Sequence, residues 1–376
     1  MEDVYEPQED SYLLQKFVRK YARGKILDLG TGSGIQALTA AKKKKVKSVL
    51  AVDVNPEAIR QLKEKIKQEK LKKIKVKDSN LFSQISGKFE TIIFNPPYLP
   101  QDPGIEDVAL YGGKKGWELS EKFFQQASNY LTPNGKILFL FSTLTNKAKI
   151  EELIHHPLLE FRELGKLKLS FEELFVYEIK KSKILQELEK KGISKIIYFT
   201  HGQRGEIFVG FHKKIKVAIK IKRKESLAQR RIQNEAFWLK KLNKKKIGPK
   251  LLFSAKDYLV YEFVEGIFIK EILRQKVKLK KIMAAVLQQC FILDQLKINK
   301  EEMHRPWKHI IISKNNQLVL IDFERAYRTE KPHNVTQFGD FLLSWGLVSR
   351  EKMIKALINY KKEQTSRNFK IIFDLL

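Results

Sequence analysis

The stretch Ile92-Ile93-Phe94-Asn95-Pro96-Pro97-Tyr98 joins an apolar run to an asparagine, two prolines and a tyrosine. The apolar run is typical of a buried strand in a parallel sheet. Proline has no N–H and a fixed φ angle, so the two prolines end the strand in a stiff, extended turn. Ligands of open α/β sheets bind beyond the carboxyl ends of the strands. We therefore expect the Asn95 amide at the mouth of a cleft, although an ordinary strand-ending turn is the alternative.

Three further predicted strands precede this stretch, and each ends in a carboxylate. Residues 24–28 lead into the glycine-rich turn 30–34, where glycine allows the backbone to approach a ligand closely. The turn has no P-loop lysine, so phosphate binding is not expected there. The sequence predicts an α/β domain with a mostly parallel sheet. We expect four polar residues to line one edge of it, although each alone suits a helix cap or turn: Asp28, Asp53, Asp78 and Asn95.

The N-terminal stretch Tyr5-Glu6-Pro7-Gln8-Glu9-Asp10-Ser11 precedes a predicted helix. We expect Asp10 or Ser11 to cap this helix. Its apolar face should include Leu13, Leu14, Phe17 and Val18. A helix packed beside the expected cleft could lend Glu9 or Asp10 to a positively charged ligand, and a solvated capping turn is the equal alternative.

This arrangement resembles the class I S-adenosylmethionine-dependent methyltransferases. Within that class, Asn95-Pro96-Pro97-Tyr98 resembles enzymes that methylate planar nitrogens, both N6-adenine enzymes and HemK-type glutamine enzymes. The Tyr5–Ser11 stretch resembles the opening of the short archaeal and eukaryotic HemK-like enzymes. Those enzymes methylate the glutamine of the Gly-Gly-Gln loop in class I peptide chain release factors. The resemblance covers about residues 1 to 180.

The resemblance implies a role for each motif residue. Asn95 would accept from and donate to the substrate amide, Pro96 would offer its carbonyl, and Tyr98 would pack on the substrate beside Pro97. A glutamine amide is a poor nucleophile, so orientation and acceptors aimed at its N–H groups contribute most, and no general base is expected. Asp53 would hold the ribose and Asp78 the adenine. The full set implied for S-adenosylmethionine is Asp28, Gly30, Thr31, Gly32, Asp53, Asp78, Ser79 and Asn95.

The expected partner is a class I release factor, and a small zinc-ribbon activator subunit is a further expectation from relatives of this group. Adenine in RNA or DNA, or a lysine, stays open as the methyl acceptor. The Gly- and Pro-containing stretch 101–117 is expected to form a substrate lid.

A polar boundary divides the chain into predicted domains 1–181 and 182–376. The second half resembles an α+β protein-kinase-like domain of the compact RIO and Bud32 kind. By this resemblance Gly202 and Gly205 would cover the phosphates of ATP, and Lys220, at the end of Val217-Ala218-Ile219-Lys220, would pair with Glu235. Asp322, which follows the apolar run 318–321, would hold Mg²⁺.

The kinase pattern breaks at the catalytic loop. Counting back from the isoleucines 310–312 puts His304 at the position of the catalytic aspartate and His309 at that of the metal-binding asparagine. Matching His-Arg instead puts Pro306 at the aspartate position. His304 is the candidate base if its pKa lies near neutral. A pseudokinase or an ATPase-like regulator is at least equally consistent with the sequence.

Composition limits the other possibilities. The 376 residues carry a formal net charge of +30, which favours RNA or ribosome contact, although lysine runs such as 42–45 and 244–246 also suit a general lysine bias. Cys290 is the single cysteine, which excludes disulfides within the chain and cysteine zinc sites. No apolar run reaches membrane-spanning length and no signal-peptide pattern is present, so a cytoplasmic protein without a membrane partner is expected.

Overall fold

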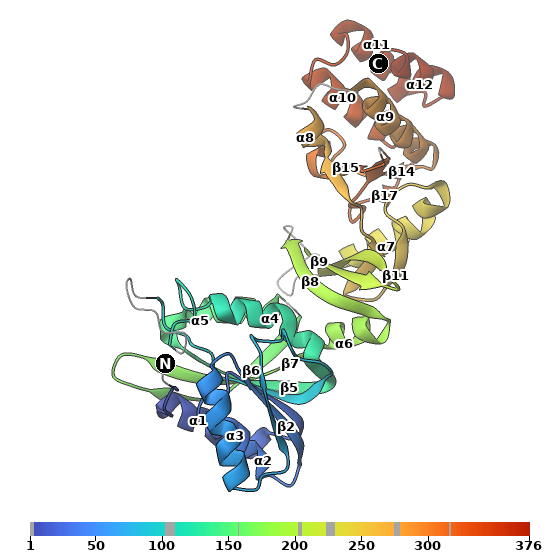
Figure 1. Ribbon diagram of the computed structural model, residues 1–376. Helices are drawn as coiled ribbons and strands as arrows, with labels where there is room; N and C mark the ends of the chain where they lie inside the picture. Colours follow the sequence, from blue (N-terminus) through green and yellow to red (C-terminus); the bar gives the residue numbers. More distant parts are fainter. Residues whose placement is uncertain are drawn as a thin grey trace. The chain divides into compact units, whose positions relative to one another are not determined.

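The computed structural model describes residues 4–101, 110–156, 158–201, 205–222, 230–273, 279–315 and 317–376 (Figure 1). The chain divides into two compact units, Met1–Ile197 and Tyr198–Leu376. The boundary predicted after residue 181 precedes helix α6 (Lys183–Lys190), which this division leaves in the first unit. The domain limits 1–181 and 182–376 therefore stay a prediction.

A seven-stranded sheet in the order β3-β2-β1-β4-β5-β7-β6 forms the centre of the first unit. Strands β1 to β5 pair in parallel, and β7 lies antiparallel between β5 and β6. This confirms the predicted Rossmann-like fold with a mostly parallel sheet. The strands are β1 (Gly24–Leu29), β2 (Val46–Asp53), β3 (Ile74–Asp78), β4 (Phe89–Phe94), β5 (Leu131–Ser142), β6 (Leu159–Lys168) and β7 (Glu173–Lys181).

Helices cover both faces of this sheet (Figure 1). The helices α1 (Glu9–Tyr21), α2 (Ile35–Ala41) and α3 (Pro56–Gln68) share an aliphatic core with the sheet that includes Leu14, Ala37 and Leu62. On α4 (Glu118–Tyr130), Phe123 stacks on Phe139 of β5, and α5 (Lys147–His155) packs beside α4.

The start of α1 differs from the prediction that Asp10 or Ser11 caps it. Helix α1 begins at Glu9, after Gln8, and has no side-chain cap. Asp10 and Ser11 lie in its first turn and are buried. The Asp10 carboxylate is not available as a cap because it accepts hydrogen bonds from Tyr5 and Asn95.

The strand register brings the predicted strand ends together. Leu29 of β1 lies opposite Val52 of β2 and Phe94 of β4, and Asp53 lies opposite Asp78 of β3. The residues that follow these positions therefore leave the sheet at the same edge.

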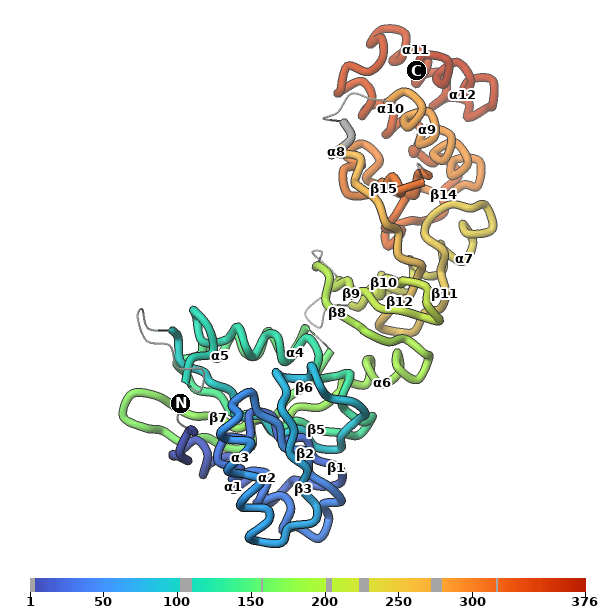
Figure 2. The backbone as a smooth tube through the Cα atoms, viewed as in Figure 1, coloured from blue at the N-terminus to red at the C-terminus, as the bar shows by residue number. Residues whose placement is uncertain are grey.

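A five-stranded sheet in the order β11-β12-β10-β9-β8 comes next along the chain, and the division into units falls within its strand β8 (Figure 2). Its strands are β8 (Ile193–His201), β9 (Gly205–His212), β10 (Ile215–Lys222), β11 (Leu251–Ser254) and β12 (Tyr258–Glu262). The helix α7 (Arg231–Leu242) contacts β10, β11 and β12.

A mainly helical part follows. Small sheets are formed by β13 (Gly266–Phe268), β15 (Ile310–Ser313) and β16 (Leu318–Leu320), and by β14 (Ile298–Asn299) and β17 (Tyr327–Arg328). The helices are α8 (Ile269–Leu273), α9 (Leu279–Gln295), α10 (Asn334–Ser344), α11 (Arg350–Lys362) and α12 (Ser366–Phe373). Their core includes Cys290, Phe338 and Tyr360. Across the described residues, no helix has the length and apolar character needed to cross a bilayer.

Candidate functional site

A cavity of about 490 Å³ lies at the carboxyl edge of the sheet in the first unit. Its walls are formed by the segments that follow strands β1, β2, β3 and β4, and by the N-terminal stretch that leads into α1. The lining residues include Tyr5, Asp10, Ser11, Gly30, Thr31, Gly32, Asp53, Asn55, Ser79, Asn80, Asn95, Pro96, Pro97 and Tyr98.

The turn after β1 forms one wall of this cavity. Gly30 and Gly32 have φ angles of 59° and 50°, in the left-handed region that favours glycine. A Cβ atom on Gly30 would meet nothing closer than 3.8 Å, so conformation rather than space requires glycine there. The backbone of this wall is thus open to a ligand.

Asp53 at the end of β2 is held in place by backbone donors. Its two oxygens accept from Gly32 N at 2.8 Å and Asn55 N at 2.9 Å. Each carboxylate oxygen has two lone pairs, so both can accept a further hydrogen bond from a ligand hydroxyl. These two acceptor oxygens suit the two hydroxyls of a ribose.

Asp28 and Asp78 do not line the cavity. Asp28 is buried behind the turn and accepts from Thr31 Oγ1 at 2.7 Å. Burial raises the pKa of Asp28 to about 7, against hydrogen bonds from Thr31 and the Ala37 N–H that lower it. Asp78 is exposed, and its buried neighbour Ser79 lines the cavity instead.

Asn95 follows β4 directly and has a fixed side-chain orientation. Its Nδ2 donates to Asp10 Oδ2 at 2.8 Å. An ionised carboxylate can only accept hydrogen bonds, so the nitrogen of the carboxamide must face Asp10. The Oδ1 atom is buried and has no hydrogen-bond partner among the described residues. Asn95 therefore offers one acceptor at the cavity wall.

Sequence analysis named Asp10 only as one of two carboxylates that could serve a charged ligand, and the structure shows a different contact for it, with Asn95. Asp10 is only 4% exposed, and its Oδ1 accepts from Tyr5 Oη at 3.1 Å and from the Ser11 N–H. The sequence carried a signal for this position. Asp10 precedes Leu14 by four residues and Phe17 by seven, which is the spacing of one helical face.

Carboxylates surround the two tyrosines of the cavity. Burial raises the pKa of both Tyr5 and Tyr98 above the usual tyrosine range, and the charges of Asp10, Glu172 and Glu9 add to this. Glu172 Oε2 is buried without a hydrogen-bond partner among the described residues. Residues 102–109 of the predicted lid lie outside the described residues.

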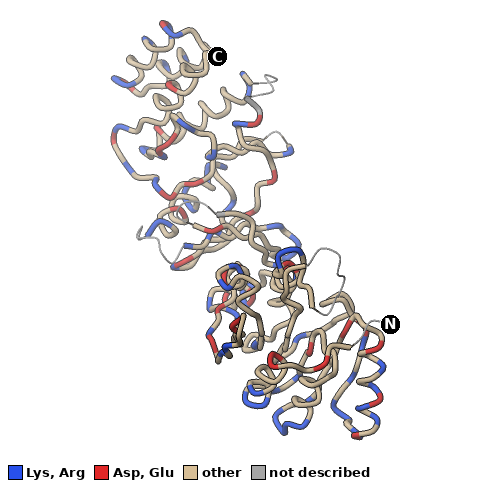
Figure 3. The backbone as a smooth tube through the Cα atoms, turned by 90° about the vertical axis from the view of Figure 1, so that its left-hand side faces the viewer, with Lys and Arg blue, Asp and Glu red and all other residues tan. Residues whose placement is uncertain are grey.

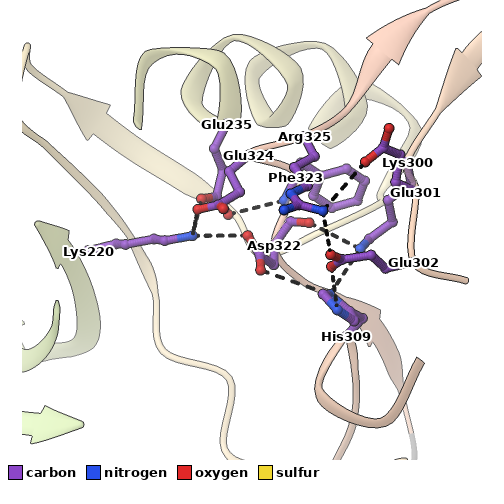
Figure 4. Close-up of polar contacts among 10 residues, drawn as sticks. All are labelled: Lys220, Glu235, Lys300, Glu301, Glu302, His309, Asp322, Phe323, Glu324 and Arg325. Atoms are coloured by element: carbon purple, nitrogen blue, oxygen red, sulfur yellow. Dashed lines mark hydrogen bonds and ion pairs between the residues drawn. The ribbon is translucent and has the colours of Figure 1, made fainter. Parts of the chain in front are cut away.

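A second polar cluster lies in the second unit around Lys220 of β10 (Figure 4). Lys220 Nζ donates to Glu235 Oε2 of α7 at 2.7 Å, to Asp322 Oδ1 at 3.0 Å and to Glu324 Oε2 at 3.1 Å. Burial alone would lower the pKa of Lys220, but these three carboxylates raise it well above its usual value. The predicted pair of Lys220 with Glu235 and the placement of Asp322 beside them are thus present.

Glu235, Asp322 and Glu324 also form the set that suits a divalent cation. Oxygen atoms of the three side chains lie within 4.8 Å of one another. Carboxylate oxygens are the ligands that Mg²⁺ takes. Sequence analysis did not single out Glu324, because a glutamate two residues after Asp322 has no place in the kinase pattern.

The two predicted histidines differ in their surroundings. His304 is exposed and is not one of the ten residues whose contacts Figure 4 draws. His309 Nε2 lies 2.9 Å from Glu302 Oε2, and its Nδ1 lies 3.5 Å from Lys300 Nζ. Burial and the Lys300 charge lower the pKa of His309 to about 4. His309 is therefore neutral at pH 7, donates from Nε2 and accepts at Nδ1.

The two predicted phosphate-loop glycines are placed differently. Gly202 lies outside the described residues. Gly205 begins β9, where a Cβ atom would lie 3.5 Å from Lys220 Cε.

Comparison with known proteins identifies relatives of the first unit. The family model of the methyltransferase small domain matches residues 8–166. A protein of Methanocaldococcus jannaschii with the provisional name protein N5-glutamine methyltransferase is 36% identical over 179 residues, which are 46% of this chain and 90% of that protein. Methyltransferase HEMK2 of Mus musculus is 32% identical over 167 residues, 40% of this chain and 76% of that protein.

The release factor glutamine methyltransferase of Streptococcus pneumoniae is 34% identical over 122 residues, 30% of this chain, and the match spans 43% of that enzyme's length. Among solved structures, the E. cuniculi Mtq2–Trm112 complex, which methylates the termination factor eRF1, aligns with 48% of this chain and 99% of the matched chain, at 23% identity and a TM-score of 0.39. WbdD in complex with a kinase inhibitor aligns with 98% of this chain and 88% of that chain, at 14% identity and a TM-score of 0.47.

The family follows from the M. jannaschii relative, nine-tenths of which this chain covers. Through its first unit the chain belongs to the protein N5-glutamine methyltransferase family and is an S-adenosylmethionine-dependent methyltransferase.

Proposed function

We propose that the first unit methylates the side-chain nitrogen of a protein glutamine, in the Gly-Gly-Gln loop of a class I release factor. The observation that carries this proposal is the Asn95 carboxamide, whose buried Oδ1 has no hydrogen-bond partner among the described residues while Nδ2 donates to Asp10. A buried acceptor of this kind is completed by a ligand N–H. The names of the M. jannaschii and S. pneumoniae relatives support glutamine as the source of that N–H.

The size of the cavity and the hydrogen-bonding groups that line it fit S-adenosylmethionine. A volume of about 490 Å³ lies within the range of small-molecule sites. The glycine turn, Asp53 and Ser79 would hold the nucleoside and methionine parts, and when bound the cofactor supplies a methyl group on a sulfonium sulfur.

The residues after β4 act on the acceptor. Asn95 Oδ1, and the carbonyl of Pro96 beside it, would accept the two N–H groups of the substrate amide and orient its nitrogen. Orientation of this kind lowers the barrier without proton transfer. After the nitrogen gains the methyl group, one of its protons leaves to water, so no base is needed.

The local charge favours a protein acceptor over a nucleic acid. Lys and Arg residues occur along both units (Figure 3), in keeping with the net charge of +30. At the cavity, in contrast, the charged side chains that raise the pKa of Tyr5 and Tyr98 are the carboxylates of Asp10, Glu172 and Glu9. A phosphate backbone would be repelled by these groups.

The test is to incubate the protein with a class I release factor and methyl-labelled S-adenosylmethionine, with and without a small zinc-ribbon activator subunit. Mass spectrometry should localise the label to the glutamine of the Gly-Gly-Gln loop. A release factor with glutamate at that position should stay unlabelled. Label on a lysine, or on RNA or DNA offered in the same mixture, with none on the glutamine, would overturn the proposal.

We also propose that the second unit is kinase-like and binds ATP with Mg²⁺ without transferring phosphate. The pairing of Lys220 with Glu235 and the three carboxylates beside it support nucleotide binding. The catalytic loop argues against phosphate transfer, since no carboxylate stands at the position of the catalytic aspartate and both nitrogens of His309 are engaged. His304, the candidate base, is exposed.

A fluorescent ATP analogue should bind in the presence of Mg²⁺ and lose affinity in Asp322→Asn. The same protein should give no labelled product with γ-labelled ATP and general kinase substrates. Failure of the analogue to bind would overturn the nucleotide proposal, and phosphate transfer would overturn its non-catalytic part.

A further inference from the structure

We infer that Asp10 is a positioning residue, which selects glutamine over glutamate by fixing the orientation of the Asn95 carboxamide. This inference rests on the proposed glutamine methylation. It deepens that proposal by naming the residue that decides what kind of group the site accepts.

The two ends of a carboxamide have nearly the same shape and opposite hydrogen-bonding character. If Oδ1 of Asn95 faces the acceptor, the site takes an N–H donor such as a glutamine amide. If Nδ2 faces it, the site takes an acceptor such as a glutamate carboxylate. Nothing in the carboxamide itself decides between these two states.

Asp10 decides because an ionised carboxylate cannot donate. Its Oδ2 lies 2.8 Å from Asn95 Nδ2, and turning the amide over would bring Oδ1 against this negative oxygen. The cost is the loss of a charge-assisted hydrogen bond and, in addition, the repulsion of two acceptors. The Asp10 carboxylate therefore leaves Oδ1 as the atom available to the substrate.

Asp10 is itself rigidly held. It lies in the first turn of α1 and is 4% exposed. Tyr5 Oη and the Ser11 N–H both donate to its Oδ1, which leaves Oδ2 for Asn95. These contacts connect the N-terminal stretch to β4, 85 positions away along the chain.

The experiment compares Asp10→Asn with Glu9→Gln in the full chain. Both variants remove one negative charge near the cavity, but only the first removes the acceptor that orients Asn95. An asparagine at position 10 can pair with Asn95 in either orientation. Two peptides serve as probes, one that contains Gly-Gly-Gln as substrate and one that contains Gly-Gly-Glu as inhibitor. Calorimetry of S-adenosylmethionine binding checks that each variant is folded.

In Asp10→Asn we expect kcat for the Gly-Gly-Gln peptide to fall by about tenfold or more, which corresponds to one lost charge-assisted hydrogen bond. Inhibition by the Gly-Gly-Glu peptide should strengthen by a similar factor, with S-adenosylmethionine affinity within about twofold of the wild type. Glu9→Gln should keep the wild-type preference for glutamine. A defect that is only structural would lower both the turnover of the Gly-Gly-Gln peptide and the inhibition by the Gly-Gly-Glu peptide.

If Asp10→Asn matches Glu9→Gln in both measurements, the inference is wrong. If the wild type does not methylate the Gly-Gly-Gln peptide or the release factor, the proposed function fails instead, and the two failures are thus distinct. Should Asp10→Asn not fold, Asp10→Ala replaces it, because it also removes the anionic acceptor. Asp10→Glu, which keeps a carboxylate, should retain more of the preference for glutamine than either.

Discussion

At the scale of single residues, Asn95 Oδ1 is a buried acceptor at the cavity wall that the described residues do not satisfy. Leaving such a group unpaired costs about 1–3 kcal/mol. The stiff Pro96-Pro97 backbone and the bond to Asp10 keep it in place nevertheless. This is the arrangement expected where a ligand completes the hydrogen bond.

Asn95→Ala removes this acceptor and leaves the glycine turn and Asp53 intact. We expect kcat for methyl transfer to fall by about 10²–10³, as for the loss of one preorganised hydrogen-bonding group. Calorimetry should give a dissociation constant for S-adenosylmethionine within about threefold of the wild type, because the main contact that is lost is to the methyl acceptor and not to the cofactor. Unchanged turnover would remove Asn95 from the mechanism.

Asp28 gives a pH dependence of stability. Its pKa is raised to about 7 by burial, whereas an unfolded aspartate titrates near 3.9. Between about pH 3.9 and pH 7 the folded protein keeps a proton on Asp28 that the unfolded chain has lost. The stability that this proton contributes is therefore fully present at low pH and is lost as the pH rises toward 7. The loss is at most about 1.4 kcal/mol per pH unit.

The asparagine side chain of Asp28→Asn is uncharged at every pH, so this variant lacks the pH-dependent contribution to stability. The free energy of unfolding of the wild type minus that of Asp28→Asn should therefore fall between pH 5 and pH 7.5, as measured by urea unfolding. A difference that is constant over this range would show that Asp28 titrates normally.

At the scale of elements, a buried ion cluster joins β5 to β7. The Glu178 side chain is 1% exposed and contacts Lys136 at 2.8 Å, Arg162 at 2.9 Å and Lys180 at 2.7 Å. Burial alone would raise the pKa of Glu178, but these cations hold it at about 2. Lys136 is itself buried and depends on this carboxylate.

Glu178→Gln should destabilise the first unit by about 3–5 kcal/mol, because it leaves a buried ammonium without its counter-charge. Glu173→Gln is the matched control, since its pair with Lys166 on the same β6–β7 hairpin is exposed and should cost under about 1 kcal/mol. Thermal unfolding of both variants measures the difference. Equal losses would mean that the Glu178 cluster contributes no more than a surface pair.

The elements also show what sequence could and could not predict. Strands such as β1 and β4 are buried on both faces, so continuous apolar runs identified them. The edge strand β6 was missed because most of its side chains are exposed and it has no apolar run. The predicted cap at the start of α1 was wrong because Asp10 pairs with Asn95, directly after β4, and such long-range pairing leaves no local pattern.

The same limit applies to the second unit. The order Lys220, Glu235, Asp322 was predicted from local motifs, and the structure brings the three side chains together. Glu324 and Lys300 were not predicted, since their contacts with Lys220 and His309 depend on how the loops around β16 fold.

At the scale of the whole molecule, α6 belongs energetically with the first unit. Lys181 at the end of β7 has a fully buried side chain that pairs with Glu189 of α6 at 2.7 Å. Lys181 Nζ also donates to the Leu131 carbonyl at 2.9 Å. Leu185 and Leu188 of the same helix are buried as well.

A chain cut after residue 192, which keeps α6, should therefore be more stable than a chain cut after residue 182. The shorter fragment loses the counter-charge of Lys181, which is worth several kcal/mol for a buried ion. Thermal unfolding of the two fragments measures this, and methyl transfer by the longer fragment shows whether the second unit is needed for chemistry. Equal melting temperatures would contradict the role given to α6.

The most direct measurement is a crystal structure of the full chain with S-adenosylhomocysteine and a Gly-Gly-Gln peptide. The expected result has the glutamine nitrogen within hydrogen-bond distance of Asn95 Oδ1, with Asn95 Nδ2 still on Asp10 and the nucleoside against the glycine turn. A peptide bound elsewhere, or a glutamine amide that makes no contact with Asn95, would contradict it.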